Sequence, residues 1–153
     1  MEIRPANQSD TSEIRILLHQ LGYDIPIDEM GQRLAALSEQ TSDAVLLAVE
    51  RKQICGLIAI HWTQMLHLAK PMARIVTLIV REDARKKGIG RRLVEAGSEL
   101  VKRQGCGWLE LTMGMHRTEA HAFYEAMGFK ATSLKFRCSL NEPLSAAELA
   151  SGE

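Results

Sequence analysis

The sequence lacks several features that mark specialised classes of protein. It has only three cysteines among 153 residues, at positions 55, 106 and 138. Because they are odd in number and show no metal-ligand spacing, we expect neither a disulfide framework nor a metal site. No apolar run approaches the roughly 18 residues of a membrane-spanning helix, and residues 1–5 do not resemble the start of a signal peptide. These absences favour a cytoplasmic protein with no membrane partner.

The chain also lacks net charge, since 19 basic residues balance 19 acidic ones. A protein that wraps nucleic acid normally carries a basic excess, so we expect no nucleic-acid partner. The charges are nevertheless segregated along the chain. The first 50 residues hold nine acidic and three basic residues, whereas residues 81–92 hold six basic and two acidic ones. This distribution indicates an anion site at residues 81–92 and a region suited to a cation elsewhere.

The length favours one domain over residues 1–140, with an Ala/Ser/Glu-rich tail at 141–153 that we expect to fray. The first helix is predicted to begin at Asp10, with Glu13 at the capping-box position. Apolar periodicity predicts further helices from residue 28, over 90–104 and over 118–127. Strands are predicted at the N-terminus, over 44–50, 54–62, 73–80 and 108–113, and near 134–138. This order predicts a single mixed α/β domain.

The densest feature is the basic run Arg81–Arg92, which follows a predicted strand and opens a predicted helix. A helix N-terminus offers unpaired N–H groups and the positive end of the helix dipole, so it binds phosphate well. Gly88 and Gly90 let the backbone approach a ligand closely. The run is therefore interpreted as a pyrophosphate cradle, against the alternative of a solvated basic helix start. It is no Walker loop, and Leu93 stands where a dinucleotide fingerprint needs its third glycine.

Two segments resemble motifs of one known family, the GNAT superfamily of N-acetyltransferases. Residues 85–90 match its Arg-x-x-Gly-x-Gly/Ala loop, and residues 120–129 are similar to its Ala-x-x-Phe-Tyr-Glu-x-x-Gly-Phe segment. The two motifs occur in the family's order, and the resemblance covers residues from about Glu2 to Leu140. It implies a three-layer α/β fold with a central, mostly antiparallel sheet. That sheet is expected to be splayed between its fourth and fifth strands and flanked by about four helices.

The resemblance further implies direct transfer of the acetyl group of acetyl-CoA to a primary amine, with no metal. Acetyl-CoA would lie where the two strands splay, with its pantetheine arm bonded to the fourth strand and its pyrophosphate on the glycine loop. The cofactor contacts implied in this way are Leu78, Ile79, Val80, Arg85, Lys86, Lys87, Gly88, Ile89, Gly90, Arg91, Arg117 and Tyr124. Arg117 stands where many members of the family carry an asparagine, and its other interpretation is a surface cation at a helix start.

The catalytic roles implied by the resemblance fall on two residues, and a third candidate comes from its position in the predicted fifth strand. The backbone N–H of Val80 would stabilise the oxyanion, and the Tyr124 phenol would be the general acid for the departing thiolate. Tyr124 has an alternative interpretation as a core aromatic. Glu110 is the candidate base, acting through water, although a surface carboxylate explains it as well. His61 and His116 are the other candidates for the base.

The acceptor is the least specified part of the prediction. Asp24, Asp28 and Glu29 lie beside Tyr23 in the segment 22–29, where acidic side chains favour a cationic acceptor but also suit a helix start or a solvated loop. We favour a small-molecule amine. A protein lysine or N-terminal amine remains an alternative, as does a non-catalytic acyl-CoA-binding module. A homodimer is also left open, and only one strand is expected after Phe129 where the family usually has two.

Overall fold

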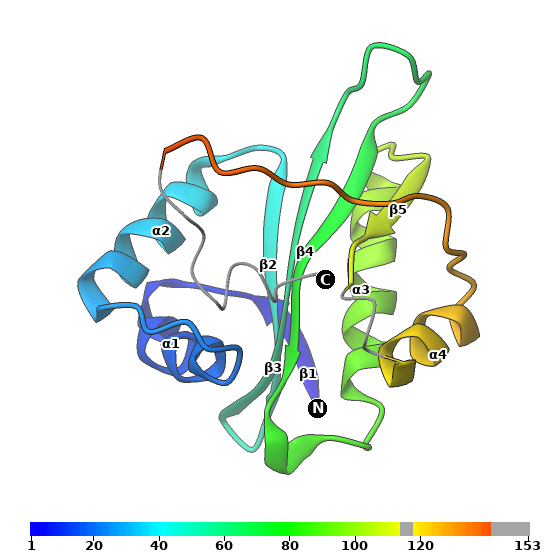
Figure 1. Ribbon diagram of the computed structural model, residues 1–153. Coiled ribbons are helices and arrows are strands. Elements are labelled where there is room, and N and C mark those ends of the chain that lie inside the picture. The colour runs from blue at the N-terminus through cyan, green and yellow to red at the C-terminus, as the bar shows by residue number, and fades with distance from the viewer. Residues whose placement is uncertain (114–117, 142–153) are drawn as a thin grey trace.

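A five-stranded sheet forms the middle layer of the protein, which the computed structural model describes for residues 1–113 and 118–141 (Figure 1). Its strands are β1 (Glu2–Pro5), β2 (Asp43–Glu50), β3 (Gln53–Thr63), β4 (Met72–Val80) and β5 (Trp108–Leu111). They lie in the order β1-β2-β3-β4-β5, and every neighbouring pair is antiparallel except β4 and β5, which are parallel. The mostly antiparallel mixed sheet confirms the predicted architecture.

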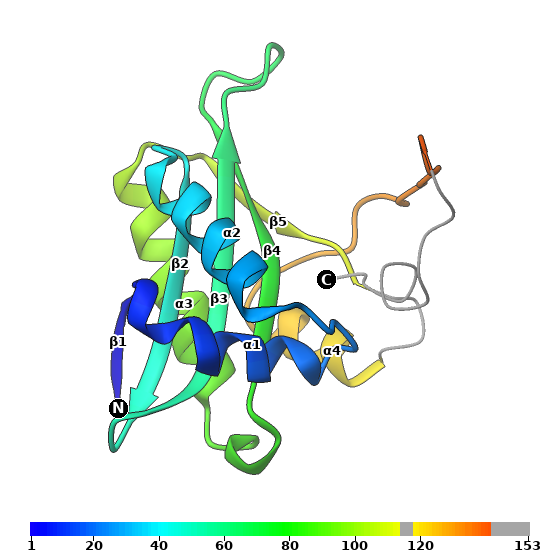
Figure 2. The same ribbon diagram turned by 90° about the vertical axis from the view of Figure 1, so that its left-hand side faces the viewer.

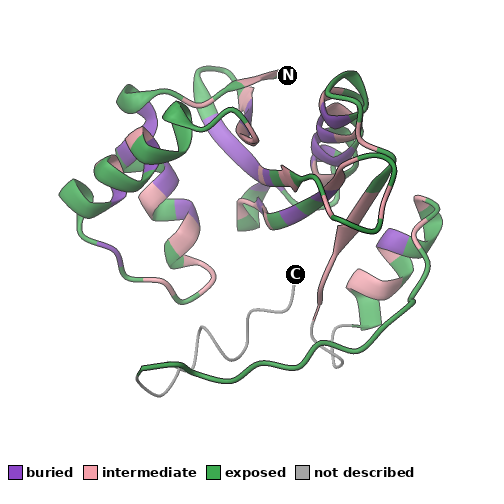
Figure 3. Ribbon diagram, turned by 90° about the horizontal axis from the view of Figure 1, so that it is seen from above, coloured by how far each residue is buried: buried purple, intermediate pink, exposed green. Residues whose placement is uncertain are grey.

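Helices cover both faces of this sheet. Figure 1 shows α1 (Thr11–His19) and α2 (Ile27–Glu39) on one side, and α3 (Ile89–Arg103) and α4 (Thr118–Ala126) on the other. The view from above in Figure 3 shows the buried residues on the surfaces where these layers meet. Among the described residues, no helix is long and apolar enough to cross a membrane.

Two hydrophobic clusters hold the layers together, one on each face of the sheet. On the face of α3, the side chains of Ile58, Ile60 and Ile75 pack against Leu93 and Val94 of the helix. On the face of α1 and α2, the cluster consists of Ile14, Leu17, Ile25, Met30, Leu34, Leu47, Ile54, Leu57 and Ile79. Because β3 and β4 contribute to both clusters, these central strands are buried on two faces, as their continuous apolar sequence predicts.

The start of α1 differs from the prediction. Asp10 makes no capping bond to α1, and its buried carboxylate instead accepts hydrogen bonds from the guanidinium of Arg4 at 2.8 and 2.9 Å. The same carboxylate accepts the backbone N–H of Asn7, closing a capping box one turn earlier. Glu13 accepts the N–H of Ile54 on β3 at 3.0 Å. The predicted cap at Asp10 and Glu13 is therefore wrong, because both carboxylates bond to other groups.

The strand predicted near 134–138 is also wrong. Residues 129–140 have no regular secondary structure, and Leu134 and Phe136 are 75% and 89% exposed. The apolar alternation is present, but a strand also needs a neighbouring edge to bond with, and no described strand pairs with this segment. Of the tail predicted over 141–153, the residues from 142 onward lie outside the described part of the chain.

Candidate active site

Strands β4 and β5 pair over only half the length of β4. Residues Met72–Ile75 are in register with Trp108–Leu111, and no described strand continues this pairing beside Val76–Val80. A bulge lies where the pairing stops, because the partners of Ala59 and Ile60 on β4 are Thr77 and Ile75, which leaves Val76 extra. Bulges bend a strand and end regular pairing. The sheet is thus splayed between its fourth and fifth strands, as predicted.

The unpaired half of β4 presents backbone groups to this gap. Arg81 donates its N–H to the carbonyl of Cys55 on β3 at 2.9 Å. Because hydrogen-bonding direction alternates along an antiparallel ladder, the N–H groups of Leu78 and Val80 point away from β3, whereas those of Ile79 point toward Leu57. Of the three predicted pantetheine contacts on β4, Leu78 and Val80 therefore have the backbone geometry that an added strand needs.

The glycine loop leads from β4 into α3. Ala84 and Ile89 are buried and anchor the two ends of the loop, while residues 85–88 between them are exposed. Gly88 adopts a φ of +78° at the N-cap of α3, a conformation that a residue with a Cβ rarely adopts. Of the described residues, none forms an ion pair with Lys86 or Lys87.

The N-terminus of α3 fits an anion. No side chain caps the helix, and its first turn holds no acidic residue. Its first N–H groups are therefore left for a ligand or water, at the positive end of a 15-residue helix. With the unpaired cations of the loop beside it, this end of the helix suits a pyrophosphate group.

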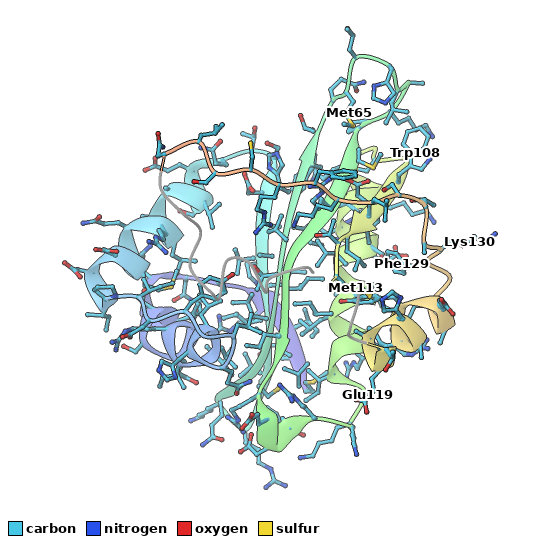
Figure 4. All side chains as sticks on the ribbon, viewed as in Figure 1. Met65, Trp108, Met113, Glu119, Phe129 and Lys130 are labelled. Carbon is cyan, nitrogen blue, oxygen red and sulfur yellow. The ribbon has the colours of Figure 1, made fainter. Side chains whose placement is uncertain are left out.

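Gly90 brings three elements of the site together. A Cβ built at Gly90 would lie 3.5 Å from the ring of Phe123 on α4 and 3.7 Å from the side chain of Val80 on β4. The first turn of α3, the end of β4 and the side of α4 that carries Phe123 therefore meet at this residue. Figure 4 labels Met113, after β5, and Phe129, after α4, and both pack against the same apolar cluster.

Tyr124 is a buried residue of α4 with 6% of its surface exposed. Its ring meets Phe123 edge to face at 5.0 Å between centroids, and Phe129 at 5.6 Å. These contacts fix the direction of the ring, which a positioned acid requires, and they also make it a core aromatic. The two interpretations of this residue are therefore compatible.

Gln20 is a site residue that the sequence analysis missed. Its side-chain amide, just after α1, donates to the carbonyl of Val80 at 3.3 Å and accepts the N–H of Glu82 at 3.1 Å. It thus fastens the end of β4 and the start of the basic loop to α1. Nothing in the local sequence signals this role, because the two segments are about sixty residues apart.

A row of polar side chains crosses four strands on the face of α1 and α2. The register aligns Asp43, His61, Arg74 and Glu110 across β2, β3, β4 and β5. His61 Nδ1 lies 3.1 Å from Asp43 Oδ1, and Glu110 Oε1 accepts Arg74 Nε at 3.0 Å. Glu110 faces away from the cluster that contains Leu109 and Leu111. Both described candidates for the base are therefore held in pairs on the same face of the sheet.

Two hollows lie apart from this gap. A groove of about 500 Å³ between α3 and α4 is lined by residues such as Arg91, Glu95 and Met127, and a smaller one lies beside β2 and α2. Neither hollow is lined by Val80 or Tyr124, so neither coincides with the candidate site. His116 and Arg117 lie outside the described residues, among which no group of three or more metal-ligating side chains occurs.

Comparisons with known proteins agree with this geometry. The family model described as "Acetyltransferase (GNAT) family" matches residues 12–129, which is more than half of the chain. An uncharacterized N-acetyltransferase of Bacillus subtilis is 27% identical over 138 residues, covering 86% of this chain and 92% of the relative. The aminoalkylphosphonate N-acetyltransferase of Salmonella typhimurium is 26% identical over 140 residues, covering 91% of each.

Solved structures share the fold at lower identity. A GNAT family acetyltransferase of Staphylococcus aureus superposes with a TM-score of 0.78 at 24% identity, covering 91% of this chain and 98% of the other. An aminoglycoside N-acetyltransferase in complex with CoA gives 0.81 at 17% identity, covering 92% and 94%. The family match includes the glycine loop and the α4 segment. The chain therefore belongs to the GNAT family and is an acetyl-CoA-dependent acyltransferase.

Proposed function

We propose that this enzyme transfers the acetyl group of acetyl-CoA to the primary amine of a small molecule. One observation carries the site assignment: the outward-facing backbone of Leu78 and Val80 lies next to the uncapped start of α3 and to Lys86 and Lys87 of the preceding loop, which form no ion pair with a described residue. The first feature suits an extended amide-containing arm, and the second suits a pyrophosphate. Acetyl-CoA contains both, and it supplies the thioester when bound.

The residues of the chain divide the work as follows. The N–H groups at the start of α3 and the side chains of Arg85, Lys86 and Lys87 hold the pyrophosphate. The N–H of Val80 donates to the thioester oxygen as negative charge develops on it. The phenol of Tyr124 donates its proton to the departing sulfur. Gln20 keeps the end of β4 in place for these contacts.

The acceptor amine must lose its proton before it attacks. Glu110 is the proposed base, taking that proton through water, and Arg74 holds its carboxylate in one position. His61, paired with Asp43, is the alternative base on the same face of the sheet. The variants Glu110→Gln and His61→Asn separate the two candidates, because only removal of the base should lower kcat.

The proposed acceptor class rests on charge and on the relatives. Three acidic residues, Asp24, Asp28 and Glu29, lie around the start of α2, beside the face that carries Glu110. An acidic surface attracts a cationic amine. The Salmonella relative is named for an aminoalkylphosphonate and the structural neighbour for an aminoglycoside, and both names denote small amines.

The test is thiol release from acetyl-CoA across a panel of small amines, a lysine peptide and a peptide with a free N-terminus. We expect turnover with a small amine, and about a hundredfold lower kcat for Tyr124→Phe with loss of the basic limb of the pH profile. Tyr23→Phe is the matched control, since it removes the only other phenol in the chain. Cofactor binding without turnover on any amine would instead indicate an acyl-CoA-binding module.

A further inference from the structure

A side-chain nitrogen of α4 is buried without a hydrogen-bond partner among the described residues. It is Nε2 of His121. Folded proteins satisfy nearly all such atoms, because a buried donor or acceptor that makes no bond destabilises the fold. His121 as a whole is only partly buried, so its ring reaches inward from a surface that a ligand can approach. The nitrogen therefore marks a position from which the protein can bind a polar group.

The place of His121 on α4 connects it to the candidate site. It lies three residues before Tyr124, and residues three apart are neighbours on one side of a helix. On the other flank of Tyr124, the Phe123 ring lies 3.5 Å from a Cβ built at Gly90. Side chains of a helix lean toward its N-terminus, so the Tyr124 ring extends over the turn that carries His121. The imidazole and the phenol therefore border the same part of the site.

The helix that carries His121 lies where β5 no longer accompanies β4. Figures 1 and 2 show α4 at the height of the half of β4 with which β5 does not pair, on the side of the sheet opposite α1 and α2. The candidates for the base, His61 and Glu110, are held in pairs on the face of α1 and α2. His121 is therefore separate from them and belongs to the side of the gap that α4 borders.

An extended arm that bonds to β4 as an added strand uses only part of its polar groups. Such groups point to both sides of an extended segment, and one edge strand bonds only with those that face it. Amide groups of a pantetheine arm that face away from Leu78 and Val80 point into the gap, where no described strand offers a backbone partner. A side chain of α4 with a buried polar atom is suited to bond them.

We propose that Nε2 of His121 forms a hydrogen bond with an amide of the pantetheine arm of acetyl-CoA and so holds the arm against α4. This contact rests on the cofactor site proposed above. A histidine ring nitrogen either donates or accepts, depending on the tautomer, so it suits the N–H or the C=O of an amide. The role of His121 is then to bind the arm, whereas Tyr124 acts on the sulfur.

The same nitrogen affects the stability of the free protein. It destabilises the fold while it makes no bond, and a bond to the arm removes that cost. Leucine is similar in size to histidine and has no polar side-chain atom, so His121→Leu removes the cost in the free protein and the bond in the complex. We expect the Tm of the ligand-free variant to rise by about 2–4 °C. A substitution that only disturbed packing would lower the Tm instead.

Titration calorimetry of the full-length protein tests the contact with acetyl-CoA and with 3′-phospho-ADP, the part of CoA that lacks the pantetheine arm. His121→Leu should weaken acetyl-CoA binding about tenfold and leave the affinity for 3′-phospho-ADP unchanged. His121→Gln should bind acetyl-CoA within about twofold of the natural protein, because its side-chain amide also donates and accepts. His19→Leu is the matched control, since it makes the same exchange at an exposed position at the end of α1 and should change neither affinity.

Nuclear magnetic resonance of isotope-labelled histidine locates the bond. The signals absent from His121→Gln identify His121, and we expect acetyl-CoA, but not 3′-phospho-ADP, to shift its Nε2 resonance. An unmoved resonance overturns the proposal, as does a His121→Leu variant that binds acetyl-CoA as tightly as the natural protein, because the partner of the nitrogen is then water. An equal loss of affinity for both ligands also overturns it. A natural protein that binds neither ligand refutes the cofactor site itself, and the contact with it.

Discussion

The packing of α3 on the sheet can be tested by replacing glycine with alanine at two helix positions, Gly97 and Gly31. Gly97 lies in α3, and a Cβ built there would stand 2.4 Å from Ile60 Cδ1 and 3.3 Å from Ile58 Cδ1. Gly31 lies in α2, where the nearest atoms to a built Cβ are at 3.7 and 3.8 Å. Alanine therefore fits at Gly31 without movement and collides at Gly97.

The expected effects have opposite signs. In a helix interior alanine is favoured over glycine by about 1 kcal/mol, and Gly31→Ala should gain most of that. Gly97→Ala gains the same amount but forces Ile60, which is 2% exposed, out of its place. Overpacking of this kind costs about 1–3 kcal/mol, and a 2.4 Å approach belongs at the upper end. We expect Gly97→Ala to lower the free energy of unfolding by about 1–2 kcal/mol.

Urea unfolding monitored by circular dichroism measures the free energy of unfolding of both variants, which should depend on urea concentration with the same slope. In a chain of this length, 1 kcal/mol corresponds to a shift in Tm of about 2–4 °C, so thermal melts should separate the two variants by about 5–10 °C. If Gly97→Ala is as stable as Gly31→Ala, α3 does not pack on β3 through this glycine. The close contact between Gly97 of α3 and Ile60 of β3 would then be wrong.

Three further predictions concern other parts of the fold. The hydrogen bond from Arg4 lowers the pKa of the Asp10 carboxyl in the folded protein. The pair therefore stabilises the fold fully above the pKa of about 3.9 that Asp10 has in the unfolded chain, and this stabilisation is lost as the pH falls through the lower pKa of Asp10 in the folded protein. Arg4→Gln should therefore cost about 2 kcal/mol in unfolding free energy at pH 7, with the difference shrinking below pH 4; a difference independent of pH contradicts this. Gly56→Ala places a Cβ 2.9 Å from the side chain of Leu93 and so pushes α3 away from β3. Calorimetry should then find several-fold weaker binding of acetyl-CoA, and an unchanged affinity contradicts this prediction. Burial raises the pKa of the Cys55 thiol whereas Cys138 is exposed, so a thiol reagent should label Cys138 in the native protein and Cys55 only after urea is added, as mass spectrometry of the peptides would report.

The elements that could be predicted from the sequence are those whose pattern is local. The apolar periods of α1, α3 and α4 and the β-branched run of β4 predict these elements correctly, because each pattern is complete within a few turns or residues. The glycine loop at 85–90 is predictable for the same reason. The segment near 134–138 has an equally regular pattern, but whether it becomes a strand depends on an edge elsewhere, which the pattern does not contain.

The contacts that were missed join residues far apart in the chain. Glu13 bonds to Ile54 on β3 rather than capping its own helix, and Gln20 holds Val80 at the end of β4. The pair formed by Arg74 and Glu110 depends on the parallel register of β4 and β5. Residue types and spacing suggest Glu110 as a base, but only the register shows that a guanidinium already holds its carboxylate.

The splay between β4 and β5 has a consequence for the lifetime of the protein. No described strand pairs with Val76–Val80 on the side of β5, so a ligand bonded there would take the place of a neighbouring strand. Binding to the folded chain alone adds about 2.7 kcal/mol of stability at a ligand concentration one hundred times Kd. If acetyl-CoA binds there as proposed, resistance to proteolysis should rise with the concentration of acetyl-CoA.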